Sequence, residues 1–153
     1  MGREKALRRR IRWLTGFFLI GLVVSGVTAI PLQIETEWLA RYSSAQWLVR
    51  IHDALVQTQS QYPFLFYGTD WLAFGHFVIA IAFVGAFKDP VRNRWLFDFG
   101  LIACALVIPW ALFFGAVRGI PFWWRLIDCS FGIIGCIPLW FCRTWAKELD
   151  ERK

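Results

Sequence analysis

Charged residues are scarce in this chain of 153 residues, because Asp, Glu, Lys and Arg make up only 18% of it. Hydrophobic residues make up 58%, and they include 10 Trp and 15 Phe. A soluble domain of this size could not bury so much apolar surface, and large exposed apolar patches would cause aggregation. The composition excludes an ordinary soluble domain and indicates one domain with the lipid bilayer as its solvent.

The sequence also lacks the motifs of common catalytic and metal sites. It contains no G-x-S-x-G, no H-E-x-x-H and no His-rich pattern for a pair of metal ions. Its four Cys form no C-x-x-C pair and lie in apolar segments, so they are interpreted as small buried hydrophobes rather than disulfides or a zinc site. These absences favour a protein that is not an enzyme and binds no metal.

The net charge of +6 is compatible with nucleic-acid binding, but its distribution is not. Basic residues lie in short blocks beside apolar runs, as they do in membrane proteins. We therefore predict the bilayer as the partner, together with other membrane proteins or a second copy of the chain, and no nucleic acid.

Four apolar runs are long enough to cross a bilayer as helices, which takes about 17 to 25 residues. The chain is therefore predicted to be an all-α integral membrane protein with a four-transmembrane-helix bundle in residues 13–142. A basic tail, residues 1–12, precedes the bundle, and a charged tail, residues 143–153, follows it. The predicted spans are 13–32, 71–87, 99–117 and 120–142.

The first apolar run has an alternative interpretation as a cleaved signal peptide. A basic stretch precedes it, and Val27-Thr28-Ala29 resembles a small-residue cleavage site. The run is long for the apolar core of a signal peptide, and Pro31 would follow the cut closely, so an uncleaved span is favoured.

The distribution of Lys and Arg predicts the orientation of the spans. The N-terminal tail carries six, the loop between the second and third spans three and the C-terminal tail four, so that 13 lie on one side. The other side carries four: Arg41, Arg50, Arg118 and Arg125. Because cytoplasmic loops are enriched in Lys and Arg, both termini are predicted to be cytoplasmic, in a bacterial inner (plasma) membrane.

Residues 33–70 form the predicted extracytoplasmic segment, which is too long for a simple connection. Ser43 and Gln46 fit a capping box, and helical periodicity follows, with Arg50 and Asp53 on the polar side. An amphipathic helix is predicted, either as a lid over the bundle or as a contact surface for a partner. That surface would consist of Trp47, Leu48, Ile51, His52 and Leu55.

Ionisable residues within the spans are candidate sites, because charges in lipid are costly and usually face the interior of a bundle. At 1.5 Å per residue, His76 would lie about 7 Å and Asp128 roughly 12 Å below the outer boundary of the membrane. We predict an outward-facing polar pocket in which these two residues exchange protons or hold a polar headgroup. The pocket would consist of Asp70, His76, Arg118, Arg125 and Asp128.

The same residues allow a purely structural interpretation. Arg125 and Asp128 are three residues apart on a helix and can neutralise each other. Asp70 can stabilise the start of the second span, and His76 can bond to a backbone carbonyl. Polar contacts of this kind hold membrane bundles together.

Three functions are compatible with these features, and a membrane enzyme acting on lipid from the outer leaflet is a weaker fourth, because the catalytic motifs are missing. A non-enzymatic accessory subunit or scaffold is favoured by the small size and the missing catalytic motifs. A small-solute or proton transporter is disfavoured, because the sequence shows no internal repeat and no polar path through its inner half. The third function is an electron-transfer subunit with a haem b or quinone site.

The electron-transfer alternative rests on Arg12-Trp13-Leu14-Thr15-Gly16 and the following residues to Gly26. This stretch of fewer than 20 residues resembles the first helix of membrane cytochromes of the b561 type. The resemblance implies haem, but Arg12 stands where those proteins carry a haem-ligating His. Haem b would need both His76 and His52, so no cofactor is predicted.

Overall fold

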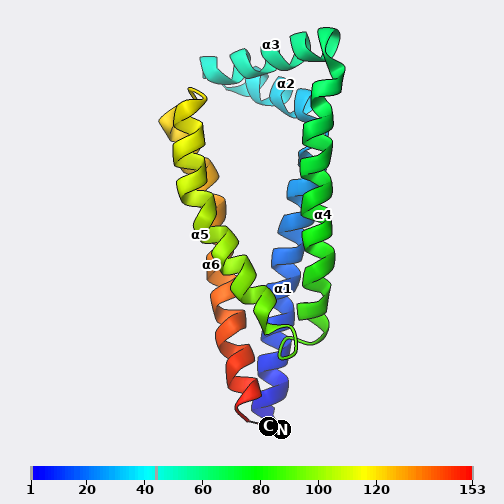
Figure 1. Ribbon diagram of the computed structural model, residues 1–153, viewed down its shortest axis with the longest axis vertical. Helices are drawn as coiled ribbons and strands as arrows, with labels where there is room; N and C mark the ends of the chain where they lie inside the picture. Colours follow the sequence, from blue (N-terminus) through cyan, green and yellow to red (C-terminus); the bar gives the residue numbers. More distant parts are fainter. Residues whose placement is uncertain (1, 44, 153) are drawn as a thin grey trace. The chain divides into compact units, whose positions relative to one another are not determined.

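The computed structural model describes residues 2–43 and 45–152, and all regular structure in these residues is helical. Four helices are long and apolar enough to cross a membrane (Figure 1). They are α1 (Gly2–Thr28), α4 (Tyr67–Lys88), α5 (Arg94–Val117) and α6 (Phe122–Asp150). Between α1 and α4 lie α2 (Leu32–Tyr42), α3 (Gln46–Gln61) and the 3-10 turn η1 (Pro63–Phe66). The prediction of an all-α membrane protein with four spans is confirmed.

The long helices reach beyond the apolar runs from which the spans were predicted. α1 begins at Gly2 and α6 continues to Asp150, so the two charged tails are extensions of the first and last helices. Arg, Lys and Glu are good helix formers, and pairs four residues apart stabilise such exposed turns. Ion pairs of this kind join Arg8 to Glu4 and Arg152 to Glu148.

The chain divides into two compact units, Met1–Ile20 with Ile81–Lys153, and Gly21–Ala80. The first unit contains the start of α1, the end of α4, and the whole of α5 and α6. Each of these helices contributes fully buried side chains to its core, among them Ile11, Phe83, Phe97 and Leu139. The centre of the Phe83 ring lies 6.5 Å from that of Phe97 and 4.9 Å from that of Phe18. Aromatic packing therefore joins α1, α4 and α5.

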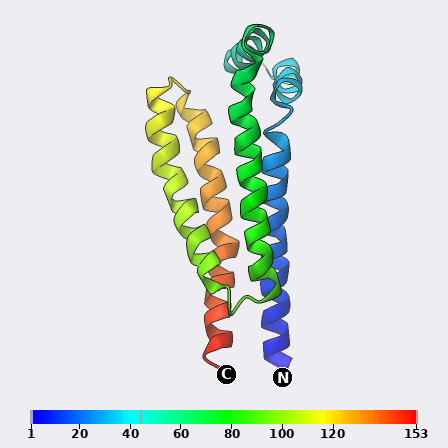
Figure 2. The same cartoon turned by 45° about the vertical axis from the view of Figure 1, so that its right-hand side comes forward.

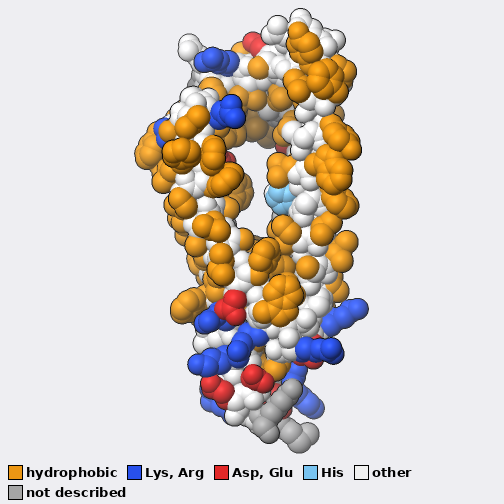
Figure 3. Space-filling model, viewed as in Figure 1, with side chains coloured by type: hydrophobic (Ala, Val, Ile, Leu, Met, Phe, Trp, Pro, Cys, Tyr) orange, Lys and Arg blue, Asp and Glu red, His pale blue; other side chains and the backbone are white. Residues whose placement is uncertain are grey.

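Charged side chains gather around the helix ends that carry the two termini (Figure 3). Arg3 pairs with Glu148 at 2.9 Å, which joins the start of α1 to the end of α6. Two further ion pairs, Arg94 with Asp150 and Arg143 with Asp98, join α5 to α6. All of these side chains are partly exposed, so each pair contributes only about 0 to 1 kcal/mol and the buried core supplies most of the stability.

The turn between α5 and α6 is a glycine-terminated helix end. Gly119 has φ +68°, and the N–H of Ile120 donates to the carbonyl of Gly115 at 2.8 Å while that of Gly119 donates to Ala116 at 3.1 Å. This pair of bonds is the Schellman motif, which needs a left-handed residue that glycine supplies without steric cost. The tight hairpin between the last two spans follows from this turn and from Pro121, which directly precedes α6.

Within the hairpin, α5 and α6 lie side by side and approach closely at small residues (Figure 2). A Cβ placed on Gly132 would lie 2.5 Å from the carbonyl oxygen of Cys104, and one on Gly100 would lie 2.8 Å from Leu139. The Sγ of Cys129 lies 3.8 Å from the carbonyl oxygen of Ile108, its acceptor. At Gly132 the backbone of α5 therefore lies where a side chain of α6 would otherwise be, and such close approach at small residues is common for helices in lipid.

The second unit contains the end of α1, the helices α2 and α3, η1 and the start of α4. Gly26 of α1 is buried against α4, since a Cβ there would lie 3.1 Å from both the carbonyl oxygen of Ala73 and the Cβ of His76. α2 and α3 pack on each other, and the side-chain amide of Gln33 donates to the carbonyl of Leu55 at 3.3 Å.

Residues 33–70, the segment predicted to be extracytoplasmic, contain most of α2 and the whole of α3, where the sequence predicted one helix. α2 was missed, although Pro31 directly before it, Glu35 in its first turn and Arg41 in its last turn are typical helix-end signals. The capping box predicted from Ser43 to Gln46 is wrong. Ala45 occupies the N-cap position of α3, and its own N–H donates to the Ser43 hydroxyl at 3.2 Å.

Replacement of Gly132 by Ala should lower the unfolding free energy by about 2 kcal/mol, because the new methyl group would force α5 and α6 apart. Gly75→Ala is the control, since a Cβ at Gly75 meets none of the described atoms within 4 Å. It should be neutral or stabilise α4 by up to about 1 kcal/mol. Reversible unfolding in detergent measures both, and equal effects of the two substitutions would refute the close contact at Gly132.

Candidate functional site

Arg125 is held inside the α5–α6 hairpin. Its Nη1 donates to the carbonyl of Leu112 at 3.2 Å, and its guanidinium carbon lies 5.3 Å from the centre of the Phe122 ring. Gly115 makes the room, because a Cβ there would lie only 2.4 Å from the Cδ of Arg125. The arginine therefore links α6 to α5, an arrangement that could not be predicted from the sequence.

Asp128 lies one turn further along α6, half-buried beside a shallow groove of about 410 Å³ on α5. Among residues 2–43 and 45–152, its carboxylate has neither a hydrogen-bond partner nor an ion-pair partner within 4.0 Å. The ion pair between Arg125 and Asp128, which their spacing on the helix would allow, is therefore not formed. The groove is apolar apart from the carboxylate, and its other lining residues are Ala103, Leu106, Val107, Trp110 and Ala111.

Arg118 is the C-cap residue of α5 and is exposed. Its backbone N–H donates to the carbonyl of Phe114 at 2.9 Å, so its main chain closes the helix while its side chain is directed to the surroundings. The first unit thus contains three of the five residues predicted to form a polar pocket, and each has a different environment.

The other two predicted residues, Asp70 and His76, lie on α4 in the second unit. Asp70 is exposed in the first turn of the helix, where a carboxylate is favourable. The Nδ1 of His76 lies 2.8 Å from the carbonyl oxygen of Leu72. Because a carbonyl oxygen can only accept, this contact requires a hydrogen on Nδ1. A single pocket formed by all five residues stays a prediction.

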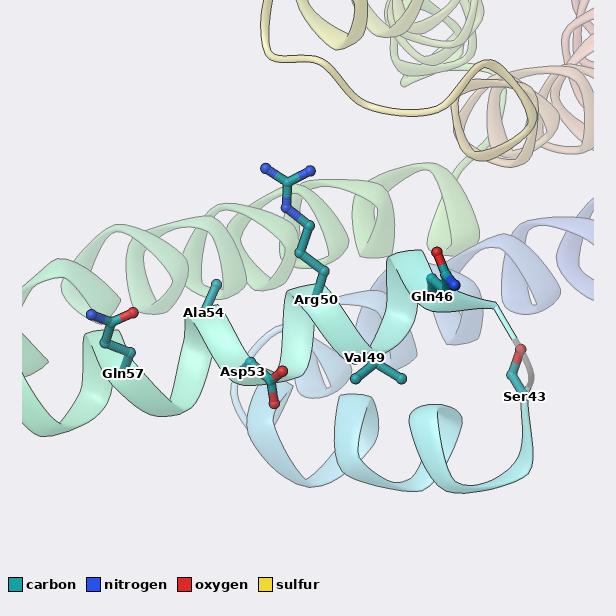
Figure 4. A pocket seen from close by; sticks show the side chains of 7 residues that line it. All are labelled: Ser43, Gln46, Val49, Arg50, Asp53, Ala54 and Gln57. Carbon is teal, nitrogen blue, oxygen red and sulfur yellow. The ribbon is translucent and has the colours of Figure 1, made fainter.

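The helix α3 is amphipathic, as the sequence predicted. On one side Leu48 is buried, whereas Trp47, Ile51, His52 and Leu55 are half-buried. Figure 4 shows the other side, where Gln46, Arg50, Asp53 and Gln57 stand along a shallow groove that begins at Ser43. Packing on α2 covers part of the apolar side, and its role as a contact surface for a partner stays a prediction.

Within the described part of the chain, no group of three or more His, Cys, Asp or Glu side chains could hold a metal ion. The two histidines considered for haem lie on different helices of the second unit, His52 on α3 and His76 on α4. The Nδ1 atom of His52 is buried without a hydrogen-bond partner among these residues.

The contact between Gly115 and Arg125 predicts a strong energetic coupling. Gly115→Ala should cost about 1 to 2 kcal/mol of unfolding free energy in the wild-type background, because its methyl group overlaps the arginine stem. In an Arg125→Ala background the cost should fall below about 0.5 kcal/mol, since the space is then empty. A double-mutant cycle in detergent measures this difference. Gly21→Ala, where a Cβ meets nothing within 4 Å, should be additive with Arg125→Ala, and an additive Gly115→Ala would contradict the contact.

The chain is a polytopic membrane protein with four candidate spans, and its charged groups within those spans have unequal surroundings. Arg125 is engaged with α5, whereas Asp128 is left facing an apolar groove. Comparison of the chain with protein-family models, with curated proteins and with solved structures finds no match.

Proposed function

We propose that this protein is a non-enzymatic subunit of a membrane assembly, in which the groove beside Asp128 receives a transmembrane helix of another protein. The observation that supports this is the carboxylate of Asp128, half-buried within a candidate span and unpartnered among the described residues. An unpaired Asp at the centre of a spanning helix costs about 2.5 to 3.5 kcal/mol. A cationic or hydrogen-bond-donating side chain from a partner would remove this cost.

The walls of the groove favour a helix over a lipid chain as the occupant. Ala103 and Ala111 lie two turns apart on α5, and small residues allow a second backbone to approach closely. Trp110, which is 68% exposed, offers a broad apolar face beside them. The complementary partner helix therefore carries a Lys, Arg or amide side chain level with Asp128 and apolar residues on either side.

We also propose that both termini are cytoplasmic and that α2 and α3 lie on the outer side, in a bacterial inner membrane. The support is the distribution of Lys and Arg, 13 against four on the two sides of the predicted spans. In this orientation Asp128 lies in the outer half of the bilayer, within reach of a partner that enters the groove from the outer leaflet side.

Affinity purification of the full-length protein from its native membranes in mild detergent tests the assembly. A membrane protein with Lys, Arg or an amide in a span should co-purify with the wild type and with the control Cys136→Ala. Asp128→Leu should lower its yield at least about tenfold, because loss of a buried hydrogen-bonded charge partner costs 2 kcal/mol or more. Asp128→Asn should retain part of it.

The stability of the isolated subunit keeps this experiment interpretable. Asp128→Leu removes an unpaired carboxylate from an apolar site, so the purified variant should unfold at the same temperature as the wild type or higher. Recovery of the wild-type chain alone, or an unchanged partner yield with Asp128→Leu, would refute the proposal.

Reporter fusions test the orientation. Green fluorescent protein fused after Lys153 should be fluorescent, and alkaline phosphatase inserted after Gln59 should be active, because each folds only on its own side of the inner membrane. Replacement of Arg8, Arg9, Arg10 and Arg12 by Gln should weaken this preference. The reverse pattern of the two reporters in the unmodified chain would show that the orientation is wrong.

A further inference from the structure

A second groove lies at the basic end of the first unit, between the start of α1 and the end of α4. It has a volume of about 450 Å³. Its apolar lining comes from two helices: α1 contributes Trp13, Gly16, Phe17 and Ile20, and α4 contributes Phe87. Trp13, Phe17 and Ile20 are 64% to 76% exposed, so this apolar channel opens sideways to the surroundings of the helices.

Two arginines stand at the polar end of this groove. Arg9 and Arg12 are three residues apart and thus lie on the same face of α1 as the apolar lining. From Arg9 to Ile20 the groove follows eleven residues, or about 16 Å, of helix. The groove therefore combines a double positive charge at one end with an apolar channel that leads away from it.

Neighbouring charges do not neutralise these arginines. Most other basic residues with a described partner at this end of the protein pair with a carboxylate. They are Arg3, Arg8, Arg94, Arg143, Lys147 and Arg152. Arg9 and Arg12 have no carboxylate within 4.0 Å among residues 2–43 and 45–152, and both are exposed. The acidic residues of the region are engaged elsewhere, so the groove keeps its positive charge.

We infer that this groove binds one anionic phospholipid, with the phosphate on Arg9 and Arg12 and an acyl chain along Trp13, Phe17 and Phe87. Guanidinium groups bind phosphate through paired N–H donors, and basic pockets between membrane helices are suited to anionic headgroups. Trp13, directly below the arginines, is of the residue type that prefers the headgroup level. Gly16 leaves the channel open, because its position carries no side chain to fill it.

Native mass spectrometry of the full-length protein tests this inference. The protein is released from mixed nanodiscs that contain equal amounts of dioleoyl phosphatidylglycerol and dioleoyl phosphatidylcholine. The wild type should retain one phosphatidylglycerol in preference to phosphatidylcholine. Arg9→Gln with Arg12→Gln should lower the retained phosphatidylglycerol at least about tenfold.

Two further variants separate the site from general surface charge. Lys5→Gln with Arg92→Gln removes the same two charges from exposed positions outside the groove and should change retention less than about twofold. Gly16→Leu keeps every charge but fills the channel, and it should lower retention by about tenfold, because an acyl chain loses its apolar contacts.

Equal losses in the two charge variants would overturn the inference, because they would show a diffuse surface effect. Unchanged retention in Gly16→Leu would overturn it as well, since the acyl chain would then lie elsewhere. Displacement of the lipid by inorganic phosphate would assign the arginines to a free anion instead. These outcomes do not depend on the partner helix at Asp128, because the readout needs no second protein.

Discussion

The close approach of α5 and α6 at Gly132 is the contact on which the rest of the first unit depends. In lipid the hydrophobic effect does not drive helices together, so their association relies on van der Waals contact and on polar groups between them. A backbone oxygen of α5 lies where a Cβ at Gly132 would be, and on α5 Gly100 and Gly115 leave room for the side chains of Leu139 and Arg125. The separation that these glycines permit brings Leu112 within reach of Arg125 and leaves Asp128 at the mouth of a groove instead of inside the hairpin.

The charged side chains of the protein differ in their partners and in their exposure. The ion pairs at the terminal ends, such as Arg3 with Glu148, are partly exposed and contribute little energy. Arg125 donates a hydrogen bond to the carbonyl of Leu112 and so links α6 to α5. Asp128, Arg9 and Arg12 have no partner of opposite charge among the described residues. Because an unpaired charge is most costly where water is scarce, the half-buried Asp128 within a candidate span is the position where an external group gains most by binding.

Much of the fold could be predicted from the sequence, because an apolar run of membrane length has few structures open to it. The amphipathic α3 was predictable as well, since its apolar residues recur at helical spacing from Trp47 to Leu55. α2 was not predicted because it is only 11 residues long, although Ile34, Trp38 and Tyr42 recur at helical spacing and its ends carry helix signals. The environment of Arg125 could not be predicted either. Spacing along one helix placed Asp128 within its reach, but the competing carbonyl of Leu112 lies on another helix, and only tertiary packing at Gly115 brings the two together.

The two unpaired sites of the first unit call for different occupants, and their chemistry separates them. The groove at Asp128 is negative and lies within a span, so an anionic or zwitterionic lipid cannot bring a cation to it without burying a headgroup in hydrocarbon. A transmembrane helix can, because its own backbone is already satisfied and a single side chain supplies the donor. The groove at Arg9 and Arg12 is positive and lies where the apolar part of α1 begins. At this groove an anionic lipid places its phosphate on the arginines and its acyl chain in the apolar channel at little cost. A protein partner would first have to displace such a lipid. With a lipid at Arg9 and Arg12, the two arginines meet a phosphate at the depth where phosphates lie. With a partner helix at Asp128, the carboxylate meets a donor at a depth that only a protein side chain reaches.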